Sequence, residues 1–231
     1  MKPNMSVRKI NKSHVSLTGI VHSKKNGVHN EFESSLEQDL IYRLEFDYNI
    51  KSFDEQPVTI EYKGEDGKNR RYTPDFLVTY RKDIEPAKWF KPMLCEVKYR
   101  EELKENWKKY KPKFKAANEY AAQNDWTFKI LTEVEIRNDY LYNAKFLLPY
   151  KNATIDMGLI TTLHNAMTEL VQTTPNELIQ FASRDKNRRA ELLYTLWLMV
   201  ACGDIRCDLS RRITMNTEIW STDNIPTFIK P

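Results

Sequence analysis

The sequence has few cysteines and no long apolar run, and each absence excludes a class of protein. Its 231 residues include three cysteines, without a Cys-x-x-Cys spacing, which argues against a disulfide framework or a cysteine-rich zinc site and indicates a reducing compartment. The longest apolar run, Leu192–Cys202, is interrupted by tyrosine, threonine and tryptophan and falls short of the ~20 residues of a membrane span. The N-terminus lacks the apolar segment of a secretory signal. We therefore expect a cytoplasmic protein that does not bind a membrane.

Acidic residues are missing from the first 30 positions. The basic residues there are Lys2, Arg8, Lys9, Lys12, Lys24 and Lys25. Because the chain carries a net charge of +4, residues 31–231 alone carry −2. We interpret residues 1–30 as a basic N-terminal arm, which fits a nucleic-acid partner or a solubilising flexible tail.

The pattern of the next 120 positions predicts a mixed α/β domain over residues 31–150. Ser34–Glu37 matches a helix capping box. Two segments rich in β-formers, Tyr72–Tyr80 and Met93–Tyr99, read as strands. A long helix is expected over Leu103–Gln123, followed by a buried strand at Trp126–Leu131. Strand, strand, helix and strand in this order indicate an α/β core.

The remaining residues, 151–231, predict a mainly helical second domain. A helix is expected over about 156–171, a second begins at a capping box with proline at Thr174–Glu177, and a third ends at Gly203. Short strands are expected at Asp204–Leu209 and Ile213–Ile219. Three helices followed by a hairpin are typical of a winged helix, so we predict a winged-helix-like C-terminal domain.

Two carboxylates and a lysine lie on the two central strands of the first domain. Side chains alternate along a strand, so Glu96 and Lys98 share one face, and pairing of the two strands brings Asp75 close to them. Such a set of hard oxygen ligands suits Mg²⁺, and the Val97 carbonyl can add another oxygen. A Glu-x-Lys pair can also be an ordinary solvated strand edge, but the apolar residues around both motifs favour a metal site.

A third carboxylate, that of Glu37, is a further candidate ligand. At 100° per residue it falls within the arc of Leu36, Leu40, Ile41 and Leu44. A carboxylate that faces the core is costly unless it is paired or bound to metal. The alternative is that Glu37 only completes the capping box, and the two roles compete for the same group.

Four motifs occur together in an order known from one nuclease superfamily. They are Phe32–Glu37, Asp54–Pro57 (DEQP), Tyr72–Val78 (YTPDFLV) and Glu96–Lys98 (EVK). In this order they resemble the PD-(D/E)xK superfamily, which has the restriction-endonuclease-like fold with its mixed sheet, and more narrowly the TnsA-type endonucleases of transposons. The resemblance spans about residues 28–150.

The resemblance implies a metal-dependent DNA endonuclease that cuts the non-transferred (5′) strands at transposon ends during cut-and-paste transposition. Carried over by position, Glu37, Asp75 and Glu96 would hold the metal, and Lys98 would be the catalytic lysine. The implied cofactor is Mg²⁺, with Mn²⁺ as a substitute. The implied partners are double-stranded DNA, a DDE transposase (TnsB-like) and an AAA+ regulator (TnsC-like), in the bacterial cytoplasm. The alternatives are a restriction or repair nuclease of the same fold, and a non-enzymatic adaptor built on the winged helix.

Basic residues near the predicted site indicate where DNA would lie. Four lysines recur at helical spacing and would form one basic helix face, which binds phosphate or is simply solvated. The expected DNA-binding residues are Arg71, Arg100, Lys104, Lys108, Lys111 and Lys115. The third helix of the second domain is too apolar to lie in a DNA groove, so protein docking is favoured there over base recognition.

Overall fold

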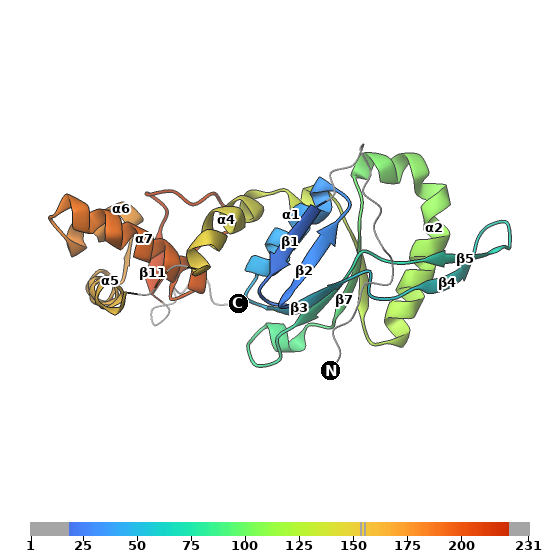
Figure 1. Cartoon of the computed structure of the whole chain (residues 1–231), viewed down its shortest axis with the longest axis horizontal. Coiled ribbons are helices and arrows are strands. Elements are labelled where there is room, and N and C mark those ends of the chain that lie inside the picture. Colours follow the sequence, from blue (N-terminus) through green and yellow to red (C-terminus); the bar gives the residue numbers. More distant parts are fainter. Residues whose placement is uncertain (1–18, 153, 155, 222–231) are drawn as a thin grey trace. The chain divides into compact units, whose positions relative to one another are not determined.

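The computed structural model describes residues 19–152, 154 and 156–221. The chain divides into two compact units, Met1–Arg137 and Asn138–Pro231 (Figure 1). The sequence placed this boundary near residue 150. The structure places it earlier because Asn143 ties its helix to the second unit: its amide nitrogen donates to the carbonyls of Leu209 and Arg211, and its amide oxygen accepts from the Ile213 N–H.

A four-stranded mixed sheet forms the centre of the first unit (Figure 1). In spatial order its strands are β3 (Ile50–Glu55), β6 (Phe76–Tyr80), β7 (Met93–Val97) and β8 (Thr127–Leu131). β6 is antiparallel to both β3 and β7, whereas β8 is parallel to β7. The predicted α/β core with a mixed sheet is confirmed, and it fits a restriction-endonuclease-like fold.

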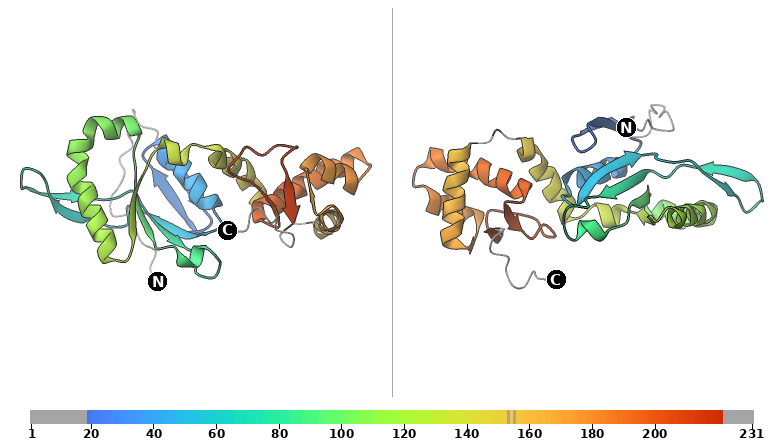
Figure 2. Two further views of the ribbon diagram at one scale, coloured as in Figure 1. Left: turned by 180° about the vertical axis from the view of Figure 1, so that it is seen from behind. Right: turned by 90° about the horizontal axis from the view of Figure 1, so that it is seen from below.

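Two helices cover opposite faces of this sheet (Figures 1 and 2). The first is α1 (Ser35–Phe46), whose N-cap is Ser34 as predicted, and the second is α2 (Arg100–Gln123). Residues of β7 alternate between the two cores: Cys95 and Val97 pack on the α1 side, and Leu94 packs with Phe114 on the α2 side. This alternation is the period of two expected of a strand, and it directs Glu96 towards α2.

The predicted strand over Tyr72–Tyr80 is in fact two strands. β5 (Asn69–Tyr72) pairs with β4 (Ile60–Lys63) in a hairpin whose connection contains Gly64–Gly67, and β6 begins only at Phe76. The break falls at Pro74, which has no N–H to donate to a ladder. As a result, Asp75 stands immediately before β6.

Two further expectations for the first unit are corrected. Helix α2 begins at Arg100 rather than Leu103, and it continues through Pro112. Strand β8 is not buried as predicted: it lies at the edge of the sheet, with Thr127 and Lys129 exposed. The 3-10 helix η1 (Ala87–Trp89) lies between β6 and β7, and the short helix α3 (Glu133–Ile136) follows β8.

The part of the basic arm that the structure describes is a hairpin. Strands β1 (Gly19–Ser23) and β2 (Val28–Phe32) pair antiparallel, and Phe32 is buried in the core on the α1 side. The turn contains Gly27 at φ +68°, a conformation that glycine adopts without strain. Residues 1–18 lie outside the described residues.

The second unit consists of four α-helices, a 3-10 helix and a three-stranded antiparallel sheet within its described residues. The sheet has the spatial order β10-β11-β9. In chain order the elements are α4 (Asp139–Leu147), η2 (Leu148–Asn152), α5 (Met157–Leu170), β9 (Gln172–Thr173), α6 (Pro175–Ala182), α7 (Lys186–Cys202), β10 (Ile205–Cys207) and β11 (Ile219–Ser221).

Most local signals in the second unit are confirmed. The capping box at Thr174 forms, with Pro175 in the first turn of α6, and α7 ends at Gly203 in a left-handed conformation. The predicted strand at Ile213–Ile219 is wrong, because the ladder begins only at Ile219.

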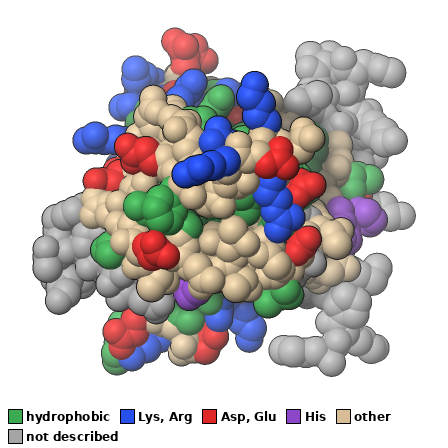
Figure 3. Space-filling view, turned by 90° about the vertical axis from the view of Figure 1, so that its left-hand side faces the viewer, with side chains coloured by type: hydrophobic (Ala, Val, Ile, Leu, Met, Phe, Trp, Pro, Cys, Tyr) green, Lys and Arg blue, Asp and Glu red, His purple; other side chains and the backbone are tan. Residues whose placement is uncertain are grey.

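None of the described helices is long and apolar enough to cross a membrane. Figure 3 shows charged side chains of both signs interspersed with apolar ones on the side where α5 and α6 lie in Figure 1.

Candidate active site

Strand pairing brings Asp75 and Glu96 together, as the sequence predicted. Phe76 is opposite Cys95 in the antiparallel ladder, so the residues just outside this pair are Asp75 and Glu96. The Asp75 N–H donates to the Cys95 carbonyl at 3.1 Å, and its Oδ2 accepts from the Val97 N–H at 2.6 Å. The backbone of β7 therefore holds Asp75 twice, once through its main-chain N–H and once through its carboxylate.

Lys98 places its ammonium among the oxygens of this group. Its Nζ donates to the Val97 carbonyl at 3.0 Å and lies 3.6 Å from Glu96 Oε1. Burial alone would lower the pKa of Lys98, but the negative charges of Asp75 and Glu96 outweigh it and raise the pKa. The structure thus brings together all three residues of the predicted Asp75–Glu96–Lys98 set.

The surroundings of Asp75 disfavour its negative charge. Burial raises the pKa of Asp75 well above its usual range, the charge of Glu96 raises it further, and Lys98 opposes both. A buried group of this kind is stabilised by a cation that neutralises it. Perturbed carboxylates beside a lysine are typical of catalytic sites, although structural ion pairs show the same pattern.

Glu37 is engaged at the start of α1. Its Oε2 accepts from the Glu33 N–H at 2.8 Å, and its Oε1 accepts from the Ser34 hydroxyl at 3.0 Å. Burial raises the pKa of Glu37, whereas these bonds and the charge of Lys98 lower it. Glu37 is therefore close enough to feel the site electrostatically, but its carboxylate serves the helix N-terminus, and its role as a metal ligand stays a prediction.

Two residues that the sequence did not single out hold Glu96. The Tyr72 hydroxyl donates to Oε2 at 2.7 Å, and Lys113 Nζ donates to Oε1 at 2.7 Å. A helical projection was available as a signal for Lys113: at 100° per residue it lies roughly 180° from Lys104, beside the apolar face that carries Phe114. The Tyr72 contact had no comparable signal, because β5 was not expected to end there.

The DEQP segment supports the site from β3. The Gln56 N–H donates to the Asp75 carbonyl at 2.8 Å, and Gln56 itself has φ +44°. Burial raises the pKa of the neighbouring Glu55 to about 8, and the charge of Glu37 contributes to this. Glu55 Oε2 accepts from the Glu31 N–H, and its buried Oε1 has no partner among the described residues. The sequence carries no signal for this partly buried acid.

The donors at the site suit a hard divalent cation. They are carboxylate oxygens and one backbone carbonyl, which Mg²⁺ prefers over nitrogen or sulfur, and the Lys98 ammonium already lies among them as a cation. Among the described residues, however, no three His, Cys, Asp or Glu side chains are arranged to hold a metal as they stand. Glu37 accepts hydrogen bonds at the start of α1, and Glu96 is bonded to Tyr72 and Lys113.

The predicted DNA-binding residues are exposed on two elements next to the site. Arg71, on β5, is 77% exposed and pairs with Glu61. The others lie along the solvent side of α2, and Lys115 is within 3.8 Å of Glu119. They are Arg100, Lys104, Lys108, Lys111 and Lys115. The hairpin β4–β5 and α2 also enclose a small hollow of about 290 Å³ that Arg70, Lys108 and Lys109 line.

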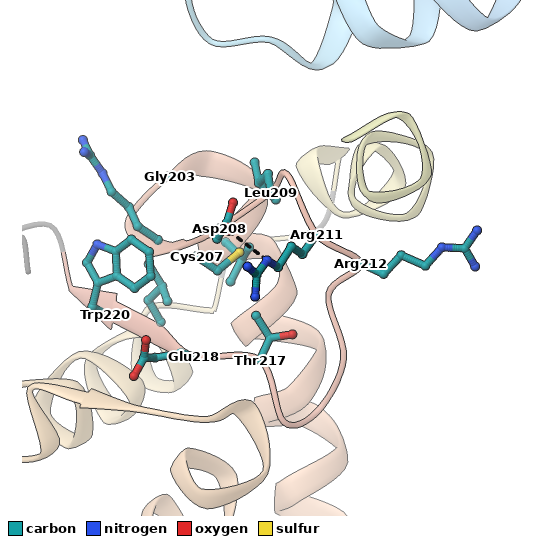
Figure 4. Close-up of a pocket in the computed structure, with 12 residues that line it drawn as sticks. Gly203, Cys207, Asp208, Leu209, Arg211, Arg212, Thr217, Glu218 and Trp220 are labelled. Atoms are coloured by element: carbon teal, nitrogen blue, oxygen red, sulfur yellow. Dashed lines mark ion pairs between the residues drawn. The ribbon is translucent and has the colours of Figure 1, made fainter. Parts of the chain in front are cut away.

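A larger cavity, of about 830 Å³, lies within the second unit (Figure 4). Arg206, Arg211 and Arg212 line it together with Trp220 and Glu218. Arg211 lies 3.9 Å from Asp208, and both of these side chains are more than half exposed, whereas Arg212 pairs with Asp139 at 3.1 Å. The α7 residues Leu192–Ala201 are mostly buried within this unit, as their apolar sequence indicated.

Comparison with known families gives one match. Residues 47–133 match the model of the TnsA-like endonuclease N-terminal domain. The matched range contains β3 to β8, and with them Asp75, Glu96, Lys98 and Lys113. No curated protein matches the chain significantly.

Proposed function

From the TnsA-like endonuclease domain carried by residues 47–133, we propose that the chain is a Mg²⁺-dependent DNA endonuclease that cuts the non-transferred strands at transposon ends. One observation carries this proposal: Asp75, Glu96 and Lys98 converge where β6 begins and β7 ends. In this proposal the transposase and the AAA+ regulator select the site, because little in the described residues resembles a base-reading surface.

The roles of the residues follow from their positions. A bound divalent metal would neutralise phosphate charge and lower the pKa of a nearby water. Asp75, Glu96 and the Val97 carbonyl would hold it, with Glu37 joining if it leaves the helix cap. Lys98, beside Glu96 and Val97, can donate a hydrogen bond to a phosphate oxygen and stabilise the charge that develops there. Tyr72 fixes the orientation of Glu96 through its hydroxyl.

The exposed lysines of α2 support DNA as the substrate. They lie on the helix that begins three residues after Val97, so a duplex whose phosphate reaches Lys98 passes close to this helix. Contacts of this kind position the DNA but do not read its sequence. We propose that Lys104, Lys108, Lys111 and Lys115 bind the phosphate backbone, with Arg71 and Arg100.

The second unit has the element order of a winged helix. Helix, strand, helix, helix, strand and strand follow one another from α5 to β11, and the sheet order β10-β11-β9 places the first strand beside the last. These features support a winged-helix-like assignment. Because α7 is buried in its own unit, we propose that this unit contacts partners with its exposed surfaces rather than by placing α7 in a DNA groove.

A cleavage assay on strand-labelled transposon ends tests the proposal. The full chain is combined with Mg²⁺ and with the transposase and regulator of the same element. We expect a break in the 5′ strand that Asp75→Ala and Lys98→Ala abolish. Asp83→Ala and Lys82→Ala, at the opposite end of β6, are matched controls that should cut normally. Equal cutting by Asp75→Ala would refute the assignment.

The same assay separates the alternatives. Efficient cutting of particular sites by the chain alone would identify a restriction or repair nuclease instead. A chain that binds DNA or the partner proteins but no divalent metal would be a non-enzymatic adaptor. Replacing Mg²⁺ with Mn²⁺ should preserve cutting, because both are hard cations that take oxygen ligands.

A further inference from the structure

The most deeply buried carboxylate of the site already has a cation of its own. Glu96 is 2% exposed, and Lys113 reaches its Oε1 at 2.7 Å, closer than Lys98 at 3.6 Å. Lys113 is itself only 15% exposed, although the other lysines of α2 face solvent. It comes from a helix that packs on the sheet and not from the ExK motif, so it is an addition to the predicted set.

Aromatic rings hold the Lys113 ammonium in this position. Its Nζ lies 4.6 Å from the centre of the Tyr72 ring, 4.5 Å from that of Tyr110 and 5.0 Å from that of Phe114. The faces of aromatic rings attract cations, most strongly where water is excluded. Tyr72 therefore contributes twice: its ring faces Lys113, and its hydroxyl donates to Glu96 Oε2. The ion pair between Lys113 and Glu96 is therefore held in place by its surroundings and is not an incidental surface contact.

This ion pair uses the same oxygen that a metal would need. Glu96 Oε1 accepts from Lys113 and also lies 3.6 Å from Lys98 Nζ, while Oε2 accepts from the Tyr72 hydroxyl. A divalent cation on Glu96 would stand beside the Lys113 ammonium at a poorly solvated position, where like charges repel strongly. Each cation therefore weakens the binding of the other to the same carboxylate.

We propose that Lys113 is an internal counter-cation of Glu96 that a divalent metal displaces on binding. This inference rests on the proposed metal role of Glu96. Lys113 keeps the buried carboxylate neutralised and oriented in the absence of metal, which avoids the cost of an unpaired buried charge. It thereby lowers the affinity of the site for metal, and Lys113 is a positioning residue for Glu96 rather than a catalytic one.

Titration calorimetry with Mn²⁺ alone, on the full chain without DNA, tests this inference. Lys113→Met keeps the length of the side chain but removes its charge, and we expect it to bind Mn²⁺ at least about tenfold more tightly than the unaltered chain. Without metal, this variant should unfold at lower urea concentration, and Mn²⁺ should restore more stability to it. Lys113→Arg keeps the charge and should bind Mn²⁺ like the unaltered chain.

A matched control uses the same helix. Lys109 is one turn earlier on α2 and exposed, so Lys109→Met should leave Mn²⁺ affinity unchanged. If Lys113→Met does not fold, Lys113→Gln offers a smaller change, because its amide can still donate to Glu96 without a charge. Unchanged or weaker Mn²⁺ binding by a folded, uncharged Lys113 variant would overturn the inference.

A crystal structure of the unaltered chain with Mn²⁺ tests the same point without a substitution. Lys113 Nζ should then have left hydrogen-bonding distance of Glu96 Oε1. If Glu96 binds the metal while the Lys113 bond stays at 2.7 Å, displacement is wrong but the proposed function stands. If the unaltered chain binds no Mn²⁺ at all, the metal role of the site is wrong, and the inference falls with it.

Discussion

The two units of this chain concentrate charge in opposite ways. At the candidate active site of the first unit, Glu96 is 2% exposed and Asp75 is held by backbone N–H and carbonyl groups. In the cavity of the second unit, Arg211 is 88% exposed and its nearest carboxylate is 3.9 Å away (Figure 4). Both places have many charged residues, but only the first takes them out of water.

The difference matters because burial has a cost that exposure does not. An exposed ion pair is worth at most ~1 kcal/mol and constrains little, whereas an unpaired buried charge costs several kcal/mol. A fold that retains Asp75 and Glu96 at its centre, and Glu55 partly covered, gives up stability to do so, which is expected of a functional site. Substitutions should therefore separate the two kinds of charge: removing buried charge should affect both function and stability, whereas removing exposed charge should leave stability almost unchanged.

The largest expected effect is that of Asp75→Asn. This substitution keeps an oxygen that accepts from the Val97 N–H but removes the charge, so we expect cleavage to fall by at least about a thousandfold. Stability at neutral pH should rise, because the raised pKa of Asp75 means that its ionised form is disfavoured in the folded chain. Cleavage assays and urea unfolding at pH 7 measure the two effects. An inactive Asp75→Asn variant that is also less stable than the unaltered chain would contradict the view that the buried charge of Asp75 costs stability.

The next effect concerns charge that is exposed but adjacent to the site. Changing Lys104, Lys108, Lys111 and Lys115 together to Gln should weaken DNA binding by about tenfold to a hundredfold and leave urea unfolding almost unchanged. The slope of log affinity against log salt should fall by up to about 3.6, since each phosphate contact contributes about 0.9. Fluorescence anisotropy over a salt series measures both.

A control variant carries the same number of changes elsewhere. Lys51, Lys82, Lys88 and Lys91 lie at the opposite end of the sheet, near the start of β3 and in the segment between β6 and β7. Changing these four to Gln should have a smaller effect on affinity and slope. Equal losses from both variants would mean that the α2 lysines act only through net charge.

The contrast between the exposed lysines of α2 and Lys113 also shows what could be predicted from the sequence. The helical spacing of the exposed set follows from periodicity, the caps at Ser34 and Thr174 follow from residue type, and the approach of Asp75 to Glu96 follows from the order of two neighbouring strands. The contact between Lys113 and Glu96 depends on how α2 rests on the sheet, and spacing within one segment does not determine this. A helical projection could have placed Lys113 near the buried face, but not its partner.

The missed elements have similar causes. The hairpin β1–β2 was read as part of an arm, although Asn26 followed by Gly27 is a typical hairpin turn signal. The break at Pro74 is hard to recognise in the sequence because the residues on either side of it both favour strands. Strand β11 contains only Ile219–Ser221, which is too short for its alternation to be recognised. The boundary at residue 137 depends on the contacts of Asn143, which no composition shift reveals.

A smaller effect, on stability alone, is expected from Glu55→Gln at a partly buried carboxylate. The pKa of Glu55 is raised to about 8, so the folded chain holds this proton to a higher pH than the unfolded chain does. The stability of the unaltered chain should therefore fall as the pH rises from about 4.5 to about 8. In Glu55→Gln the amide oxygen can still accept from the Glu31 N–H. Because the amide does not ionise, the variant should not lose stability over this pH range. Urea unfolding should show a larger advantage of Glu55→Gln at pH 9 than at pH 6, whereas Glu65→Gln, at an exposed turn, should show none.

The smallest effect is expected from Arg211→Gln in the cavity of the second unit. Its side chain is 88% exposed, and its ion pair with Asp208 spans 3.9 Å between two solvated groups, so the loss in unfolding free energy should be below about 0.5 kcal/mol. Urea unfolding in low and high salt measures this, and salt should remove what little difference exists, because screening acts on exposed pairs. A loss above about 1 kcal/mol would show that this arginine is held as firmly as Lys113, and the distinction between the two units would then no longer rest on burial.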